Sequence, residues 1–240
     1  MQLTMSVEND WLDSSHGRGL LQEESDQVKR ALESIFGDYL VQIGSWGPQD
    51  LFLEHSRTRH KVLLSWKQAD FPDALVCADS LGLASDSVDA VLLPHVLEAV
   101  LDPIGILREV DRVLRPEGHI VVLGFSSASW WGLRHSISRN GYPPGIKRHI
   151  PERRLSDWLR LLNFRISYTA QYYPVAQAGR SHAGQQEPMI QKWWNWKAMN
   201  PGYILVACKE LFTLTLVRPR WRRRTRLVGG LVNPTIRNVA

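Results

Sequence analysis

The stretch from residue 77 to residue 125 constrains the fold most, because two short apolar runs flank a helical pattern there. The runs are Val88–Leu93 and His119–Gly124. Short runs rich in Val, Leu and Ile are typical of strands buried on both faces of a parallel sheet. Between them, apolar residues recur at helical spacing: Ile104, Leu107, Val110, Val113 and Leu114. We therefore predict a β-α-β unit with a right-handed crossover.

Both ends of the predicted helix are marked in the sequence. Asp102 can cap the first turn, and Pro103 suits the first helical position. The segment Arg115–Gly118 is predicted to end the helix, because proline cannot continue it and glycine accepts the turn geometry.

Residues 78–125 also carry a family resemblance. They resemble the part of class I S-adenosylmethionine-dependent methyltransferases that follows the cofactor loop. His95–Ala99 is similar to the segment after the fourth strand in the small-molecule group, and Arg108–Phe125 is the most specific part. The resemblance covers about residues 39–125. It implies an α/β fold with a Rossmann-like, seven-stranded, mostly parallel sheet, flanked by helices and with the last strand antiparallel. It also implies methyltransferase activity and S-adenosylmethionine as the cofactor.

The resemblance places the family's glycine loop directly after the first predicted strand. The glycines of this loop let the backbone approach the cofactor. Gly44 matches the first glycine, and Gly44, Ser45 and Gly47 are predicted to bind S-adenosylmethionine. Gln42 stands where the family has an acid, and Trp46 where it has a second glycine.

The second predicted strand, Val62–Trp66, lacks the acid with which the family binds the ribose hydroxyls. Ser65 and Trp66 stand at its end instead. Only residues 67–74 separate it from the third predicted strand, Leu75–Cys77. A β-α-β crossover normally takes about a dozen residues or more. We therefore expect no full helix in this connection.

The residues Asp79, Ser80 and Leu81, which follow the third predicted strand, match the adenine site of the family. By resemblance, Asp79 accepts a hydrogen bond from the adenine amino group, and Ser80 and Leu81 follow beside the ring. The alternative for Asp79 is a turn cap, which is common for Asp. Leu93 ends the fourth strand, where the resemblance places the methyl group.

No motif identifies a catalytic residue. Methyl transfer from a sulfonium depends on alignment and a dry site more than on a dedicated triad. His95 is the one group predicted at the mouth of the sheet that titrates near neutral pH, and it is our predicted substrate residue. The alternative is a histidine at a helix start that packs against the next strand.

The remaining sequence divides into three parts. Residues 1–24 are polar and predict a loose N-terminal segment, residues 25–210 form the methyltransferase-like domain, and residues 211–240 form a basic tail. Within the domain we predict helices at 25–36 and 151–164 and strands at 165–173 and 202–210. The long connection 174–201 is predicted to be a lid over the substrate; alternatively, its tryptophans plug the sheet edge.

The net charge of +5 comes from the tail. Residues 211–240 contain seven Arg and no acid, whereas the first 210 residues contain 22 Lys and Arg against 24 Asp and Glu. The resemblance and the basic tail together leave two functions open. The first is a methyltransferase with a small-molecule acceptor. The second is a catalytically inactive interaction or RNA-binding module, with weak nucleic-acid contact by the tail. A tail that is merely solvated is a third explanation of this charge.

Neither cysteines nor hydrophobic runs indicate export. Cys77 and Cys208 are too few for a disulfide framework, and we predict both to be reduced and buried on strands. The N-terminus lacks the pattern of a secretory signal, and no apolar run approaches the ~18 residues of a membrane span. We expect a cytoplasmic protein.

Overall fold

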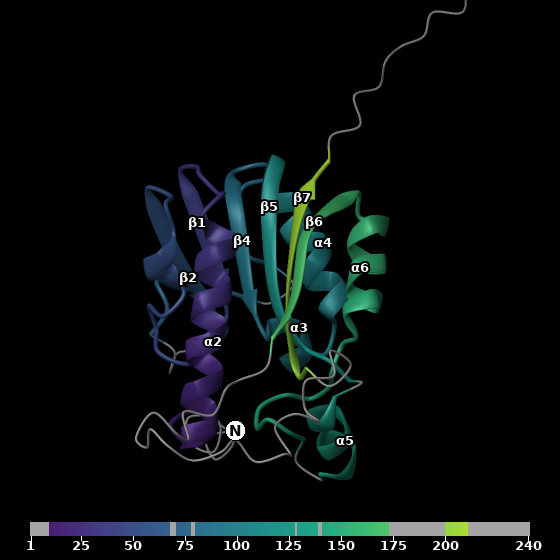
Figure 1. The fold of residues 1–240 in the computed structure, drawn as a ribbon. Helices are drawn as coiled ribbons and strands as arrows, with labels where there is room; N and C mark the ends of the chain where they lie inside the picture. Colours follow the sequence, from purple (N-terminus) through teal and green to yellow (C-terminus); the bar gives the residue numbers. More distant parts are fainter. Residues whose placement is uncertain are drawn as a thin grey trace, which may run out of the picture.

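The computed structural model describes residues 10–67, 71–77, 80–127, 129–138, 141–172 and 200–210. A seven-stranded sheet forms its centre, in the order β3-β2-β1-β4-β5-β7-β6 (Figure 1). The strands are β1 (Tyr39–Ile43), β2 (His60–Ser65), β3 (Ala74–Leu75), β4 (Val88–Pro94), β5 (Leu114–Phe125), β6 (Phe164–Tyr172) and β7 (Gly202–Lys209).

The strand directions confirm the predicted fold class. The five strands β1 to β5 pair in parallel, and β7 is antiparallel to both β5 and β6. The strand β6 therefore has the same direction as the first five. The carboxyl ends of β1, β4, β5 and β6 lie at one end of the sheet, which is where open α/β sheets bind ligands.

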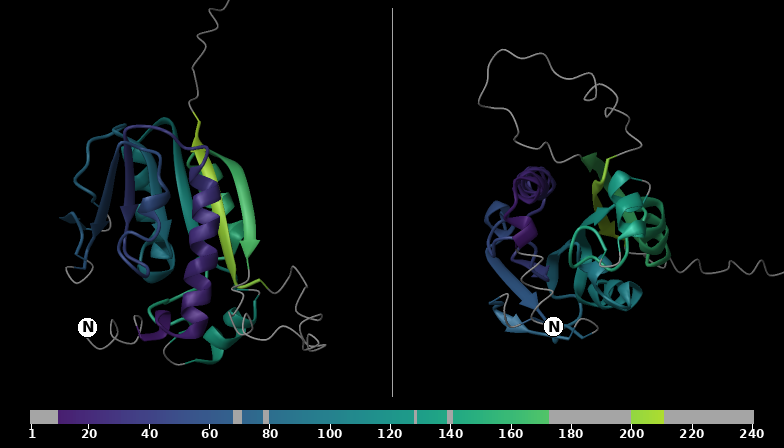
Figure 2. Two further views of the ribbon diagram at one scale, coloured as in Figure 1. Left: turned by 60° about the vertical axis from the view of Figure 1, so that its left-hand side comes forward. Right: turned by 90° about the horizontal axis from the view of Figure 1, so that it is seen from below.

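Helices cover both faces of the sheet (Figures 1 and 2). The long helix α2 packs on one face, over a core that includes Leu40, Leu92 and Leu123. On the other face, α4 and α6 enclose a second core around Val91, Leu107 and further apolar residues. The helices are α2 (Ser15–Leu32), α3 (Val96–Ala99), α4 (Pro103–Val113), α5 (Trp130–Ile137) and α6 (Glu152–Leu161), with a 3-10 turn, η1, at Leu53–His55.

The predicted β-α-β unit is confirmed. The Asp102 carboxylate accepts hydrogen bonds from the Ile104 and Gly105 amides, with Pro103 at the first helical position. The helix α4 ends before Arg115, as expected, and residues 115–118 interrupt the strand pairing, with Glu117 in a left-handed conformation at a φ of +64°. The strand β5 nevertheless begins at Leu114, which pairs with Val88, five residues before the predicted strand.

The predicted start of the first helix was wrong. We expected this helix to begin at residue 25, but α2 begins at Ser15, and the Ser14 hydroxyl caps it by accepting from the Gly17 amide. Residues 15–24 are therefore helical, and Leu20 and Leu21 are buried. The prediction failed because two glycines and a glutamate interrupt the apolar face in this part of the helix.

The connection between β2 and β3 has no helix among its described residues, as predicted from its length. The strand β3 has only two residues. Cys208 is buried on β7, but Cys77 is exposed and lies outside β3, so the prediction of two buried thiols was wrong for Cys77. No described helix is both long and apolar enough to cross a bilayer.

Several predictions concern residues outside the described part of the chain. These are the adenine-binding role of Asp79, the lid at 174–201 apart from its last two residues, and the basic tail 211–240.

Candidate functional site

A small cavity lies at the carboxyl ends of β1 and β4, where the strand order reverses. Its walls come from the loop after β1, the end of β2, the start of α3 and the loop before α6: Gly44, Ser45, Trp46, Trp66, Lys67, Pro94, His95, Val96, Ala99, Gly145 and Ile146. The cavity volume is about 30 Å³. That is room for water, whereas ligand pockets usually measure roughly 300–1,000 Å³.

The loop after β1 has glycine-specific geometry. Gly44 has a φ of +76°, and a Cβ atom there would lie 2.7 Å from the Val96 side chain. Gly47 has a φ of +77°, and a Cβ there would lie 2.7 Å from Leu21 of α2. Both positions therefore require glycine, for its backbone freedom and for close packing. At Gly47 the close neighbour is α2 itself.

Trp46, which stands at the family's second glycine, points inward beneath α2. Its side chain is buried, and its indole Nε1 donates a hydrogen bond to Glu24 Oε2 at 2.9 Å. The ring lies 4.6 Å from that of His95 between centroids. Trp46 thus belongs to the packing between the sheet and α2.

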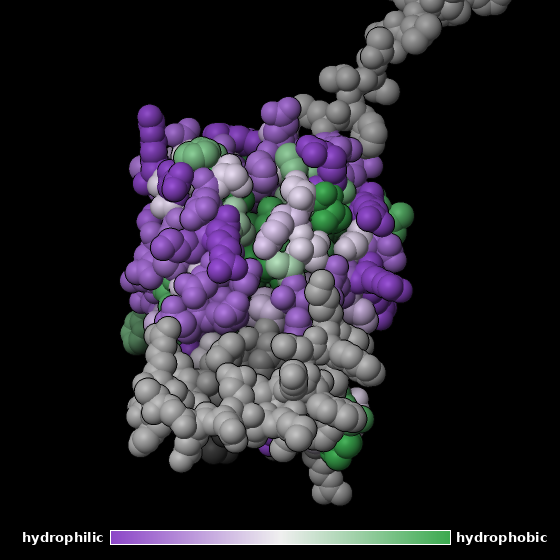
Figure 3. Space-filling view, viewed as in Figure 1, coloured by the Kyte–Doolittle hydropathy of each residue, from purple (hydrophilic) through white to green (hydrophobic). Residues whose placement is uncertain are grey.

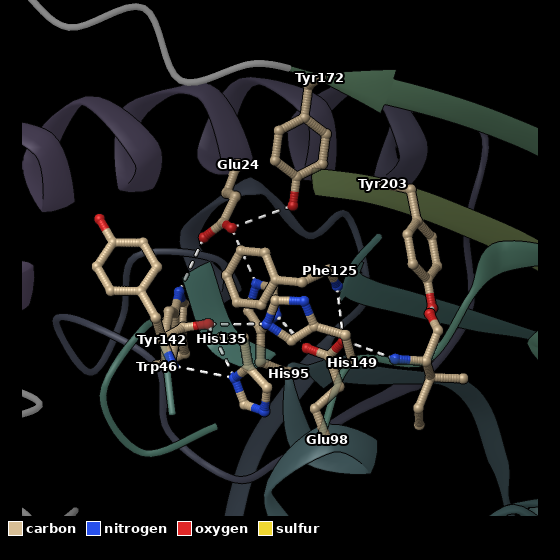
Figure 4. A network of polar contacts seen from close by, with 11 residues as sticks. Glu24, Trp46, His95, Glu98, Phe125, His135, Tyr142, His149, Tyr172 and Tyr203 are labelled. Atoms are coloured by element: carbon tan, nitrogen blue, oxygen red, sulfur yellow. Dashed lines mark hydrogen bonds and ion pairs between the residues drawn. The ribbon is translucent and has the colours of Figure 1, made fainter. Parts of the chain in front are cut away.

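His95 is the centre of a buried polar network (Figure 4). Its Nε2 lies 2.9 Å from Glu24 Oε1, and its Nδ1 lies 3.0 Å from Glu98 Oε2. The three side chains are at most 1% exposed. His95 has a left-handed backbone, with a φ of +55°, at the turn from β4 into α3. This turn places the imidazole between the two carboxylates.

Donors surround both carboxylates. Glu24 also accepts from the Tyr172 hydroxyl at 3.1 Å, in addition to the Trp46 indole. Glu98 accepts from the Phe125 amide at 2.7 Å and the Ile150 amide at 3.4 Å. Because these partners are donors, they match the acceptor oxygens of the two carboxyl groups, and a doubly protonated imidazole donates to both. The network links α2, the glycine loop, α3, β5 and β6 at one end of the sheet.

The network shifts the titration of its members. Burial lowers the pKa of His95, but the charge of Glu24 and the hydrogen bonds to Glu24 and Glu98 outweigh burial and raise this pKa to about 9. Burial raises the pKa of Glu98, against the hydrogen bond from His95. Burial also raises the pKa of Tyr172. His95 is therefore a cation at neutral pH and cannot accept a proton from a substrate.

A second group of polar rings lies beside the network (Figure 4). His149 Nε2 lies 2.8 Å from the Tyr142 carbonyl, and His135 Nδ1 accepts from the Tyr142 amide at 2.9 Å. Burial lowers the pKa of His149 to about 4. Its other ring nitrogen, Nδ1, is buried without a hydrogen-bond partner among the described residues. His149 is therefore a neutral ring 5.7 Å from Phe125.

The structure brings together three of the predicted site residues. Gly44, Ser45 and His95 line the cavity, and Gly47 follows in the same loop. His95 is not at an open mouth of the sheet, however. Its ring stacks on Phe125 of β5 at 4.0 Å, which matches the alternative of a histidine packed against the next strand.

The other described site residues lie away from this cavity. The Leu81 amide donates to Glu109 Oε1 at 2.9 Å, and the Ser80 amide donates to the Cys77 carbonyl. Leu93 is buried in the core on the α4 side. The binding roles of these residues, and of Asp79, stay predictions.

Sequence reasoning missed Glu24 and Glu98. Glu24 lay in the segment predicted to be loose. Glu98 lay in the His95–Ala99 motif, which was used only to establish the family resemblance. One signal was available for Glu24. It is spaced by four residues from Leu20 and Val28, so it occupies the apolar face of a helix, where an acid is either paired or functional.

The sheet order, its strand directions and a cavity at the β1–β4 reversal together define a Rossmann-like α/β protein of the methyltransferase type. A family model described as "Methyltransferase domain" matches residues 53–122. The chain is 32% identical over 167 residues to the uncharacterized protein YafS of Escherichia coli (strain K12), an alignment that covers 68% of each chain. The chain belongs to the class I S-adenosylmethionine-dependent methyltransferase family, whose cofactor is S-adenosylmethionine.

Solved structures share the fold. The [4+2]-cyclase SpnF matches with a TM-score of 0.58 at 20% identity, over 79% of this chain and 82% of that chain. Geranyl diphosphate methyltransferase in complex with SAM matches with a TM-score of 0.57 at 13% identity, over 79% and 85%. At these identities the likeness concerns the fold alone.

Proposed function

We propose that the protein transfers a methyl group from S-adenosylmethionine to a small-molecule acceptor. The observation that carries this proposal is the cavity between the carboxyl ends of β1 and β4, at the positive-φ glycine Gly44. The family membership supports the cofactor, and a solved relative of the same fold is a methyltransferase in complex with SAM.

The described residues fit one end of the cofactor. Gly44 and Ser45 present a backbone without bulky side chains at the cavity wall, as the methionine end requires. The ribose end is less complete, since Ser65 and Trp66 replace the family's acid. Because the cavity is far smaller than the cofactor, binding requires side chains that line it to move.

S-adenosylmethionine, when bound, supplies an activated methyl group, so the protein's own contribution is alignment and exclusion of water. The network fixes the turn after β4 through His95 and the end of β5 through the Phe125 amide. The turn after β4 lines the cavity, and Phe125 at the end of β5 stacks on the His95 ring. His149, which is neutral above about pH 4, adds no charge beside them.

Calorimetric titration with S-adenosylmethionine and with its demethylated product tests the cofactor assignment. We expect both to bind. We expect Asp79→Ala to weaken binding of both about tenfold or more, because a charge-assisted hydrogen bond contributes ~1.5–3 kcal/mol. Asp157→Ala, at an exposed position of α6, is the matched control and should bind like the unmodified protein. Equal affinity of both variants would remove Asp79 from the site.

A catalytically inactive module is the second function with support from specific observations. Trp46 fills the space beneath α2 next to the glycine loop, and the ribose acid is absent. The likeness to a [4+2]-cyclase also illustrates that this fold hosts other chemistry. Failure of both ligands to bind in the titration would favour this alternative, with the basic tail as a contact for nucleic acid.

A further inference from the structure

The segment between β5 and α6 is basic and lies at the ligand end of the sheet. Residues 126–150 contain Arg134, Arg139, Lys147 and Arg148 and no Asp or Glu. Such a run without acids contrasts with the rest of the domain, where acids outnumber Lys and Arg. The helix α5 lies in this segment, beyond the carboxyl ends of the strands (Figures 1 and 2).

One face of α5 is fixed to the protein. Ser129 caps the helix by accepting from the Gly132 amide, and Trp131 is buried against Phe125 and Tyr142. The guanidinium of Arg134 lies 4.1 Å from the centre of the Tyr142 ring. These contacts determine which side chains of α5 face outward.

The outward face of α5 is aliphatic. Leu133 and Ile137, one helical turn apart, are 51% and 77% exposed. With Arg134 and Ser138 they line a shallow hollow of about 390 Å³, and a hydrophobic area is visible over α5 in Figure 3. Leu101 is also exposed, and its carbonyl accepts a hydrogen bond from Arg148 of the same segment. Leu101, however, is followed by the exposed Asp102. Leu133 and Ile137 lie in the segment that contains cations and no acids, a combination typical of helices that lie on a membrane surface.

We propose that Leu133 and Ile137, with Arg134 and Lys147, dock the protein onto an anionic lipid bilayer. The two aliphatic side chains enter the boundary between head groups and acyl chains, and the cations lie at the lipid phosphates. Exposed aliphatic groups favour a bilayer over a nucleic acid, which would be bound through stacked aromatic side chains and phosphate contacts. Docking would turn the carboxyl ends of the strands towards the lipid, so a lipid-borne acceptor could reach the cavity.

Vesicle co-sedimentation of the full chain tests this proposal. The probes are vesicles of phosphatidylcholine with phosphatidylglycerol and vesicles of phosphatidylcholine alone. We expect binding to the anionic vesicles that weakens as salt is added. The double variant Leu133→Ser and Ile137→Ser should lower the partition coefficient about tenfold or more, since it removes the apolar contribution without changing any charge. The basic tail is unchanged in this variant, so its contribution cancels in the comparison.

The matched control replaces two apolar residues that are somewhat more exposed and lie at the opposite end of the sheet. Phe36 and Leu161 are 64% and 80% exposed, and the double variant Phe36→Ser and Leu161→Ser should bind like the unmodified protein. Circular dichroism melting shows whether each variant is folded. Absence of binding to anionic vesicles, or equal binding by both double variants, would overturn the proposal. A single-stranded RNA whose binding is weakened by the Leu133→Ser and Ile137→Ser changes would instead assign the surface to nucleic acid.

Discussion

The His95→Asn variant should lose about 3–5 kcal/mol of unfolding free energy, which is the usual effect of removing one partner from a buried ion pair. Asparagine tolerates the left-handed backbone at this position, so the loss comes from the charge. Without the imidazole, the side chains of Glu24 and Glu98 remain buried with no donor between them. Urea denaturation measured by circular dichroism gives the difference.

His60→Asn is the control for this experiment. His60 is exposed at the start of β2 and stacks on Tyr39, so its replacement should cost less than about 1 kcal/mol. If the two variants are equally stable, the network does not hold the imidazolium that its geometry indicates.

The unmodified protein should be most stable near pH 6.5 and should lose stability on both sides. The pKa of His95 is raised from 6.5 to about 9, so its contribution is fully present below pH 6.5 and disappears as the pH rises through 9. The pKa of His149 is lowered from 6.5 to about 4. The unfolded chain therefore binds a proton at this residue before the folded chain does, and stability falls as the pH decreases from 6.5 towards 4.

Each of these shifts corresponds to roughly 3 kcal/mol of unfolding free energy at its limit. Urea midpoints between pH 4 and pH 9 measure both limbs. The alkaline limb should flatten in His95→Asn, and the acid limb should flatten in His149→Gln. A limb that is unchanged in its own variant would show that another group causes it. The raised pKa of Glu98 acts in another range: its contribution falls as the pH rises from 4.5 through the pKa of the folded state, so it opposes the acid limb.

The sequence was sufficient for the parts of the fold with strong local signals. The apolar runs of β4 and β5 and the Asp102 cap depend on near neighbours, so they were predicted almost to the residue. The start of β5 was less accurate because the pairing of Leu114 with Val88 is a contact with another strand. Residues 115–118 carry turn-forming types and do interrupt the pairing, with Glu117 at a φ of +64°.

The candidate site was predictable only in its backbone. Gly44 was found from its place after the first strand, but the residues that stabilise the site were not. Glu24 and His95 are 71 positions apart, and no local pattern relates them. His95 was predicted at the mouth of the sheet, as a group that titrates near neutral pH and faces the substrate. The carboxylate that buries it comes from α2, whose start was misplaced by ten residues.

The hydrogen bond between Glu24 and Tyr172 spans 148 positions in the chain. A chain that leaves the ribosome from its N-terminus presents Glu24 early, then Trp46 and His95, and the Tyr172 hydroxyl last. The polar network is therefore incomplete until β6 has emerged. Contacts between segments that lie this far apart in the chain form slowly. In a shorter nascent chain, the acid of α2 lacks one of its buried donors. Completion of the ligand end of the sheet is thus tied to completion of the domain, and a fragment that ends before β6 should not hold α2 firmly.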